Sequence, residues 1–163
     1  MATPSTTRSP SPQLEAADRT HIGDIMTTKP VTVHPDLEVE QLLELLVDRG
    51  LSRVPVVDEE GRLIGIVSKT DLVVDLHTRG DTEVDQLGAG GRGRHVHEVG
   101  ALVRDVMTPV AFSLPATTSL GDATRRMIAD NLHAVPVTSD TGRLIGIFSA
   151  TDVMAWVAGV DLA

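Results

Sequence analysis

The sequence RVPVVDEEGRLIGIVSKTDL at residues 53–72 returns as AVPVTSDTGRLIGIFSATDV at residues 134–153. The spacing is constant, because equivalent residues such as Asp71 and Asp152 are 81 positions apart. A fixed period of this kind identifies a repeated folding unit. Each copy has two short apolar runs around a polar, glycine-containing turn, which predicts a pair of strands followed by the start of a helix. We therefore expect one small fold that is built twice.

The composition predicts a globular protein with an aliphatic core. Hydrophobic residues make up 41% of the 163 residues and charged residues 23%, an ordinary balance for a folded chain. Aromatic residues are only 2%, so aliphatic side chains must fill the interior. The sequence has no cysteine, which excludes disulfides and thiolate metal sites and is consistent with a reducing compartment.

Charge and hydropathy restrict the partners. The net charge of −9 argues against a nucleic-acid partner, because phosphate binding needs clustered lysine and arginine. No apolar run approaches the roughly 20 residues that cross a membrane. The N-terminus lacks the apolar core of a secretory signal. We expect a cytoplasmic protein without a membrane partner.

Hydrophobic periodicity predicts the order β-α-β-β-α within each repeat. In the first repeat the elements are expected at residues 31–33, 39–49, 53–58, 63–67 and 68–76. The first helix has an apolar face formed by Val39, Leu42, Leu43 and Leu46. Gly50 follows where a helix favours a left-handed residue after its last turn.

The second repeat carries the same helix signals. Its apolar face is formed by Leu120, Ala123, Met127 and Ile128. Asn131 lies 81 residues after Gly50 and is the other residue type that tolerates the left-handed conformation. Ser119 together with Asp122 predicts a capping box at the start of this helix.

The chain divides into four parts. They are a disordered tail at 1–18, a first repeat at 19–78, a linker rich in glycine and histidine at 79–100, and a second repeat at 101–160. The tail is rich in Ser, Thr and Pro and offers little to bury. A unit of about 60 residues is marginal alone, because it buries only about 60% of its unfolded surface. We expect the repeats to pack as a pseudo-two-fold pair with two equivalent clefts between them.

The segments Ser68–Asp71 and Ser149–Asp152 form the candidate functional motif. A helix is expected to begin at each serine, and a helix N-terminus suits phosphate because it presents free N–H groups and a positive dipole end. The serine hydroxyl can donate to phosphate, and the aspartate can accept hydrogen bonds from both ribose hydroxyls. The same spacing is also a capping box that needs no ligand. Spacing alone favours the cap, and the two roles can coexist.

Several motifs in both copies resemble those of CBS domains. They are Met26-Thr27 with Met107-Thr108, Val54-Pro55-Val56 with Val135-Pro136-Val137, and the runs Gly65–Asp71 and Gly146–Asp152. The resemblance covers roughly residues 20–78 and 101–158, and the pair is similar to a CBS tandem, or Bateman module. It implies an α/β (α+β) fold of two β-α-β-β-α CBS repeats.

CBS tandems commonly bind adenosine-containing molecules between their repeats and regulate another activity. The resemblance implies a stand-alone regulatory module for a nucleotide of the AMP, ADP or ATP class, with no required cofactor and with or without magnesium. It also implies a homodimer and a partner protein of unknown identity. The implied ligand-binding residues are Thr27, Thr32, Leu51, Arg53, Val54, Ser68, Thr70 and Asp71, then Thr108, Val110, Leu132, His133, Val135, Ser149, Thr151 and Asp152.

The two copies differ just before the Val-Pro-Val strand, where residues of the family often reach phosphate. Arg53 would supply a fixed charge there, whereas His133 would supply one that depends on pH. Ala134 is the counterpart of Arg53, so the second site is expected to hold phosphate more weakly. A solvated residue at a strand end is the alternative interpretation for both side chains.

Two other functions remain open. One is a ligand-free interaction scaffold, in which the Ser-x-x-Asp segments are caps only. The other is a metal-binding protein that uses His77, His95 and His97. The G-x-G-x-x-G match at residues 88–93 follows no buried strand and is interpreted as linker. The sequence lacks G-x-S-x-G, H-E-x-x-H and Walker signatures, so we do not expect an enzyme.

Overall fold

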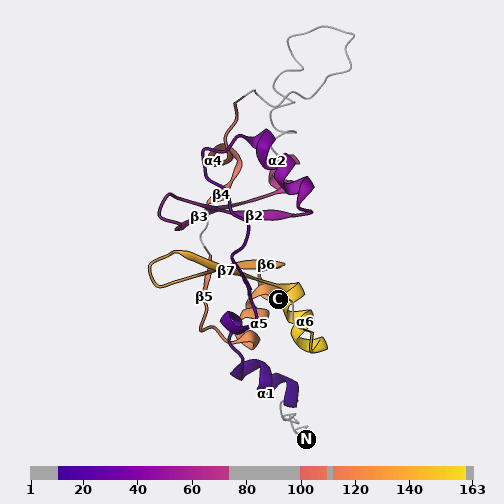
Figure 1. Cartoon of the computed structure of the whole chain (residues 1–163). Coiled ribbons are helices and arrows are strands. Elements are labelled where there is room, and N and C mark those ends of the chain that lie inside the picture. The colour runs from indigo at the N-terminus through magenta and orange to yellow at the C-terminus, as the bar shows by residue number, and fades with distance from the viewer. Residues whose placement is uncertain (1–10, 74–99, 110–111, 161–163) are drawn as a thin grey trace, which may run out of the picture. The chain divides into compact units, whose positions relative to one another are not determined.

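The computed structural model describes residues 11–73, 100–109 and 112–160 (Figure 1). Its elements in chain order are α1 (Pro12–Arg19), the 3-10 helix η1 (Ile22–Asp24), β1 (Thr27–Thr28), α2 (Val39–Asp48), β2 (Arg53–Val57), β3 (Leu63–Ser68), α4 (Val103–Val106), β4 (Thr108–Pro109), β5 (Leu114–Pro115), α5 (Leu120–Ala129), β6 (Ala134–Thr138), β7 (Leu144–Ser149) and α6 (Ala150–Ala158). Residues 69–73 are also helical. The fold is a mixed α+β fold, as predicted.

The chain forms two compact units, and each takes segments from both repeats. We name them the Asp71 unit and the Asp152 unit after a residue of each. The segments are Lys29–Phe112 and Thr138–Leu144 for the Asp71 unit, and Met1–Thr28, Ser113–Val137 and Ile145–Ala163 for the Asp152 unit. The compact units therefore differ from the sequence repeats, whose expected boundaries stay a prediction.

The Asp71 unit contains the first repeated hairpin. β2 and β3 pair antiparallel, and β4 adds to the free edge of β3 (Figure 1). Gly61 closes the turn with a φ of 75°, a conformation that glycine adopts without strain. The side chain of Asp58 accepts a hydrogen bond from the Arg62 backbone N–H at 2.7 Å, which closes the turn further.

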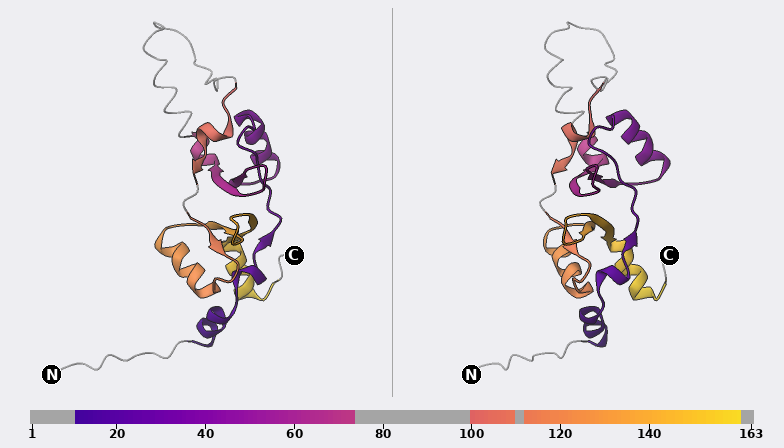
Figure 2. Two further views of the ribbon diagram at one scale, coloured as in Figure 1. Left: turned by 90° about the vertical axis from the view of Figure 1, so that its left-hand side faces the viewer. Right: turned by 60° about the vertical axis from the view of Figure 1, so that its left-hand side comes forward.

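The Asp152 unit contains most of the two strands of the second hairpin, in a sheet of order β1-β7-β6-β5. Helices α5 and α6 contact each other, and α1 packs on α5 (Figure 2). Serine and aspartate caps begin both α5 and α6, and Gly159 ends α6 with a φ of 67°.

The segment before each Met-Thr pair lies in the unit that holds the other repeat's hairpin. Ile22 is fully buried in the Asp152 unit, and its backbone N–H donates to the Thr118 carbonyl at 2.9 Å. Val103, 81 residues later, is fully buried in the Asp71 unit and donates to the Leu37 carbonyl at 2.8 Å. The two repeats thus exchange equivalent segments.

The exchanged strands have the same register in both units. Thr27 of β1 lies opposite Ile147 of β7, and Thr108 of β4 lies opposite Ile66 of β3. Each of these pairs is related to the other by the offset of 81 residues. The exchange is therefore symmetrical, and it brings each threonine to the strand that precedes a Ser-x-x-Asp segment.

The buried core is aliphatic apart from Phe148, as the composition predicts. The core of the Asp71 unit consists of Val33, Val39, Leu42, Leu46, Val54, Val56, Val67, Leu72 and Val103. The buried apolar residues of the Asp152 unit are Ile22, Leu120, Ala123, Met127, Val135, Val137 and Phe148.

The predicted helices at 39–49 and 120–128 are confirmed, but their apolar faces are narrower than expected. Gly50 and Asn131 have φ values of 62° and 53°, so both adopt the predicted left-handed conformation. Leu43 is 39% exposed and Ile128 is 76% exposed, and their placement on the buried face was wrong. Each lies at the edge of an apolar stripe whose other members are buried.

The tail was predicted to be disordered over residues 1–18, and this is wrong for 12–18, which belong to α1. Pro12 stands at the first helical position, where its fixed φ favours helix initiation. Asp18 then pairs with Arg125 of α5 at 3.1 Å, and the Thr20 carbonyl accepts a hydrogen bond from the Leu120 N–H at 2.7 Å. These contacts with α5 give the segment tertiary partners that its composition does not show.

The strand expected at 31–33 is reduced to one residue. Val33 makes an isolated parallel bridge with Val56, supported by a 3.0 Å hydrogen bond from the Val57 N–H to its carbonyl. Val31 and Thr32 lie outside this bridge, so apolar alternation over three residues overestimated the strand.

Ser119 caps α5, and its cap gives a prediction for a pH titration. The Asp122 carboxylate accepts a hydrogen bond from the Arg125 guanidinium at 2.8 Å and another from the Ser119 hydroxyl at 2.9 Å, and both lower the pKa of Asp122. Arg125→Ala is expected to raise this pKa, as measured by carboxyl NMR, whereas Arg126→Ala should leave it unchanged. These hydrogen bonds stabilise the fold at pH values above the pKa that Asp122 has in the unfolded chain. Their contribution is lost as the pH falls through the pKa of Asp122 in the folded protein, which is the lower of the two. Equal effects of both variants would contradict this assignment.

The linker at 79–99, with His95 and His97, and also His77 lie outside the described residues. Within the described ranges, no helix is both long enough and apolar enough to span a bilayer.

Candidate functional site

The Asp152 site lies where β7 ends and α6 begins. Asp152 Oδ2 accepts hydrogen bonds from the backbone N–H and from the hydroxyl of Ser149, both at 2.6 Å. The predicted capping box is therefore present in full. Asp152 is only 2% exposed and is the one buried charged residue among the described residues. A buried carboxylate must keep hydrogen-bond partners, because its desolvation is costly.

Thr27 reaches the same carboxylate from β1. Its hydroxyl donates to Asp152 Oδ1 at 3.4 Å, a long hydrogen bond across 125 residues of sequence. The segment exchange makes this contact, because it pairs β1 with β7 immediately before the cap. Thr27 is exposed and Asp152 is buried, so this hydrogen bond is partly buried and joins the surface to the carboxylate beneath it.

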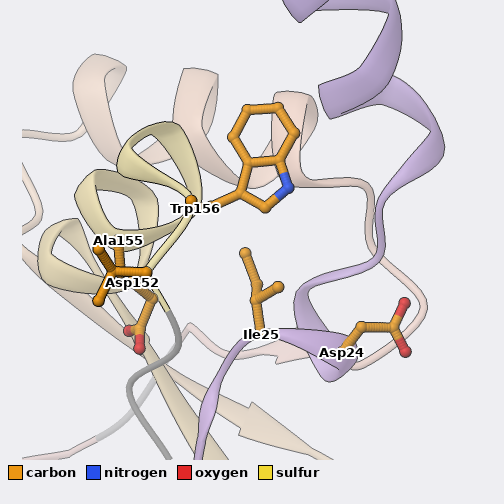
Figure 3. Close-up of a pocket in the computed structure, with 7 residues that line it drawn as sticks. Asp24, Ile25, Asp152, Ala155 and Trp156 are labelled. Atoms are coloured by element: carbon orange, nitrogen blue, oxygen red, sulfur yellow. The ribbon is translucent and has the colours of Figure 1, made fainter.

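A cavity of about 250 Å³ adjoins Asp152 along one face of α6. Its lining residues are Asp24, Ile25, Asp152, Ala155, Trp156, Gly159 and Val160. The four residues of α6 and its end, from Asp152 to Gly159, follow the i, i+3, i+4, i+7 spacing of one helix face. Figure 3 shows Ile25 pointing toward Trp156, with Asp152 and Asp24 on either side of it.

The Asp71 site has the same cap. Asp71 Oδ2 accepts hydrogen bonds from the Ser68 N–H at 2.7 Å and from the Ser68 hydroxyl at 2.6 Å. Asp71 is partly exposed, unlike its buried counterpart Asp152. Within the described part of the chain, its second carboxylate oxygen has no hydrogen-bond partner. The Asp71 site thus presents a free acceptor at the surface of its unit.

Two cations accompany the Asp71 site. Arg53 lies directly opposite Ser68 in the β2–β3 register, which places both side chains on the same side of the hairpin. Lys69 follows Ser68 directly and is exposed. Neither cation has an ion-pair partner among the described residues. Half-buried and unpaired, Arg53 is available to an anionic group.

The equivalent positions of the Asp152 site hold alanine. Ala134 is the counterpart of Arg53 and Ala150 is the counterpart of Lys69. The local backbone is the same, because Ala150 N–H donates to the His133 carbonyl at 3.0 Å as Lys69 N–H donates to the Ser52 carbonyl at 3.0 Å. The two sites therefore share a backbone arrangement and differ in charge.

The remaining predicted residues fall into three groups. Val54 and Val135 are 1% and 0% exposed, so their side chains pack in the cores. Leu51 and Leu132 are half-buried, and Val110 lies outside the described residues. Exposed residues of the set are Thr32, Thr70, Thr108, His133 and Thr151. A ligand role for each stays a prediction.

The structure regroups two of the predicted residues. Thr27 was grouped with Leu51 and Val54 of its own repeat, but it lies beside Asp152 in the other unit. Thr108 likewise lies in the unit of Asp71. Each site therefore combines a threonine of one repeat with the Ser-x-x-Asp segment of the other.

Sequence reasoning missed Lys69 and the lining residues of the cavity. A comparison of the two copies would have found Lys69, because it stands where the other copy has alanine. Trp156 also carried a signal: it is the single tryptophan in an aromatic-poor chain and lies four residues after Asp152. No group of three metal-ligating side chains occurs in the part of the chain that the structure describes.

This chain is similar to known proteins in sequence and in fold. CBSX1 of Arabidopsis thaliana, a chloroplastic CBS domain-containing protein, is 28% identical over 82% of this chain and 62% of its own length. The chain thus spans about three fifths of that relative. CBSX2 of the same plant, solved in complex with AMP, is 29% identical with a TM-score of 0.69, covering 85% of this chain and 96% of that structure.

Other solved structures agree on the fold. MJ1225 of Methanocaldococcus jannaschii is 25% identical with a TM-score of 0.75, covering 88% of this chain and 50% of that one. The CBS domain pair of MJ0100, solved with 5′-methylthioadenosine and S-adenosyl-L-methionine, is 21% identical, covers 86% of this chain and 97% of that one, and supports the fold alone, with a TM-score of 0.66. The CBS domain family model matches residues 22–77 and 103–159. The chain therefore belongs to the CBS domain family, with two repeats.

Proposed function

We propose that the chain is a regulatory module that binds an adenosine-containing nucleotide of the AMP, ADP or ATP class and signals its occupancy to a partner protein. The observation that carries this proposal is a carboxylate oxygen of Asp71 that has no hydrogen-bond partner among the described residues, next to Ser68, which lies opposite Arg53 on the neighbouring strand. The two hydroxyl groups of a ribose can donate hydrogen bonds to the carboxylate. The guanidinium of Arg53 can donate two parallel hydrogen bonds to a phosphate group. The AMP complex of CBSX2 supports the same ligand class.

The cap and the ligand role are compatible because they use different oxygens. Oδ2 of Asp71 accepts both hydrogen bonds from Ser68, which leaves Oδ1 for a ligand. Binding would signal only if the nucleotide has different affinities for two arrangements of the protein. On this proposal the module is not an enzyme, needs no resident cofactor and acts with or without magnesium.

We include self-association in the proposal. Val47 and Ile128 occupy equivalent helix positions and are 62% and 76% exposed. Val73 and Met154 are a second equivalent pair, 51% and 62% exposed. Apolar side chains at such repeated positions favour contact with a second copy, and sedimentation velocity would test it.

Thermal unfolding with AMP, ADP, ATP, S-adenosylmethionine and NADH tests the ligand. A compound at about 100 times its dissociation constant stabilises by roughly 2.7 kcal/mol, a rise in Tm of about 5–10 °C for a chain of this size. Asp71→Ala combined with Asp152→Ala should abolish the rise, whereas Asp140→Ala, an exposed turn variant, should keep it. A flat response in nucleotide-free protein would contradict the proposal.

A ligand-free scaffold is the second candidate, and the complete capping boxes favour it. Both serine–aspartate caps are satisfied by protein groups alone. A flat thermal response together with retained self-association would support this function.

A further inference from the structure

We propose that the two sites take different adenosine compounds. The Asp71 site takes one with a 5′ phosphate, and the Asp152 site takes one with an apolar 5′ substituent that carries no phosphate. This inference rests on the proposed function and specifies which ligand belongs to which site.

The charge difference between the sites is the first observation. Arg53 and Lys69 place two positive charges around Ser68, and their counterparts Ala134 and Ala150 place none around Ser149. The backbone hydrogen bond before each helix and the distance of each serine–aspartate cap are alike, so side-chain charge is one clear difference between the sites. A phosphate therefore gains two charge-assisted contacts at one site that the other cannot offer.

The carboxylates are the second observation. Asp152 is 2% exposed, and both of its oxygens already accept hydrogen bonds, from Ser149 and from Thr27. Asp71 is partly exposed, and one of its oxygens has no hydrogen-bond partner in the part of the chain that the structure describes. A ligand at Asp152 must replace the long 3.4 Å hydrogen bond from Thr27, which is the weakest contact of that carboxylate. This exchange suits a ribose hydroxyl, which donates in the same way.

The cavity beside Asp152 is the third observation. Its lining combines the apolar side chains of Ile25, Ala155, Val160 and Trp156 with about as much polar surface, and no basic side chain lines it among the described residues. Figure 3 shows Ile25 and the indole of Trp156 between the two carboxylates. Asp24 at its rim adds a negative charge, which repels a phosphate. At about 250 Å³ the cavity is smaller than sites that hold whole drug-sized ligands, about 300–1,000 Å³, so it fits a substituent.

The first repeat lacks two of the apolar residues that line this cavity. Position 75, which is the counterpart of Trp156, is an aspartate, and position 79, the counterpart of Val160, is an arginine. In sequence, these two apolar residues of the lining are therefore particular to the second repeat, as the two cations are particular to the first.

Calorimetric titration of the full chain with AMP and with 5′-methylthioadenosine tests the assignment. AMP binding should be lost in Asp71→Ala and kept in Asp152→Ala, and 5′-methylthioadenosine should show the reverse and change the fluorescence of Trp156. The Arg53→Ala/Lys69→Ala variant should weaken AMP about 10- to 100-fold and leave 5′-methylthioadenosine unchanged. The reciprocal Ala134→Arg/Ala150→Lys variant should create a second AMP site.

The outcomes separate the two proposals. If each compound binds both sites alike, or if the cation variant weakens both compounds equally, the site assignment is overturned while the nucleotide sensor stands. If neither compound nor any other adenosine compound binds, both proposals are overturned. Circular dichroism checks the folding of each variant. The Ala134→Arg/Ala150→Lys variant is expected to gain AMP binding, a result that a misfolded protein cannot give.

Discussion

Phe148→Ala should lower the free energy of unfolding by about 3–5 kcal/mol, the usual cost of removing a fully buried phenylalanine. Phe148 lies on β7, is 0% exposed and is the largest fully buried side chain of the described residues. Its removal leaves a cavity, because the surrounding structure relaxes only partially. Urea denaturation measures the loss, and Trp156 fluorescence reports on the same unit.

The repeats provide matched controls for this experiment. Val67 is the equivalent residue of the Asp71 unit and is also 0% exposed, so Phe148→Val places one repeat's core residue in the other. This variant should lose less than Phe148→Ala, because it keeps two methyl groups. Ile128→Ala, at a position 76% exposed, should change stability by no more than about 0.5 kcal/mol. Equal losses for Phe148→Ala and Ile128→Ala would refute the burial argument.

Gly146→Ala should cost about 1–3 kcal/mol by overpacking. A Cβ at this position would overlap the Met26 sulfur and would lie 3.0 Å from the Thr27 carbonyl oxygen. The methionine side chain can move aside, but the strand carbonyl cannot do so without disturbing the β1–β7 pairing. The variant should therefore also weaken any ligand contact that depends on Thr27. Thermal unfolding measures the cost.

A double-mutant cycle tests whether the close approach of Met26 causes the loss of stability in Gly146→Ala. Met26→Ala in the Gly146→Ala background should recover part of the loss, because it removes the overlapping sulfur, and the two changes should not be additive. Gly65→Ala is the equivalent change in the other unit, where the new Cβ would lie 2.5 Å from the Met107 sulfur. Strict additivity of Met26→Ala and Gly146→Ala would show that the close approach is not the reason for glycine here.

The local structure was predictable because local chemistry determines it. The helices at 39–48 and 120–129 follow from apolar spacing, and the left-handed residues Gly50 and Asn131 follow from the few residue types that adopt that conformation. The caps at Ser68 and Ser149 follow from Ser-x-x-Asp spacing. Each of these predictions depends on residues within about four positions of one another.

The segment exchange was not predictable, because the two repeats offer nearly identical partners. Met26 could meet Gly65 of its own repeat or Gly146 of the other, and the sequence around both glycines is Leu-Ile-Gly-Ile. The sequence therefore does not determine whether Thr27 lies beside Asp71 of its own repeat or beside Asp152 of the other. The cavity beside Trp156 was missed for a related reason, since it needs η1 of one repeat and α6 of the other.

The exchange also orders the assembly of the protein during its synthesis. When the ribosome has released residues up to β3, the strand β4 that completes this sheet has not yet been translated. Thr27 must wait for a partner that is 125 positions later in the chain. Neither unit is complete until most of the chain has emerged. A single repeat by itself would lack the strand that completes its sheet, and it could obtain that strand only from a second copy.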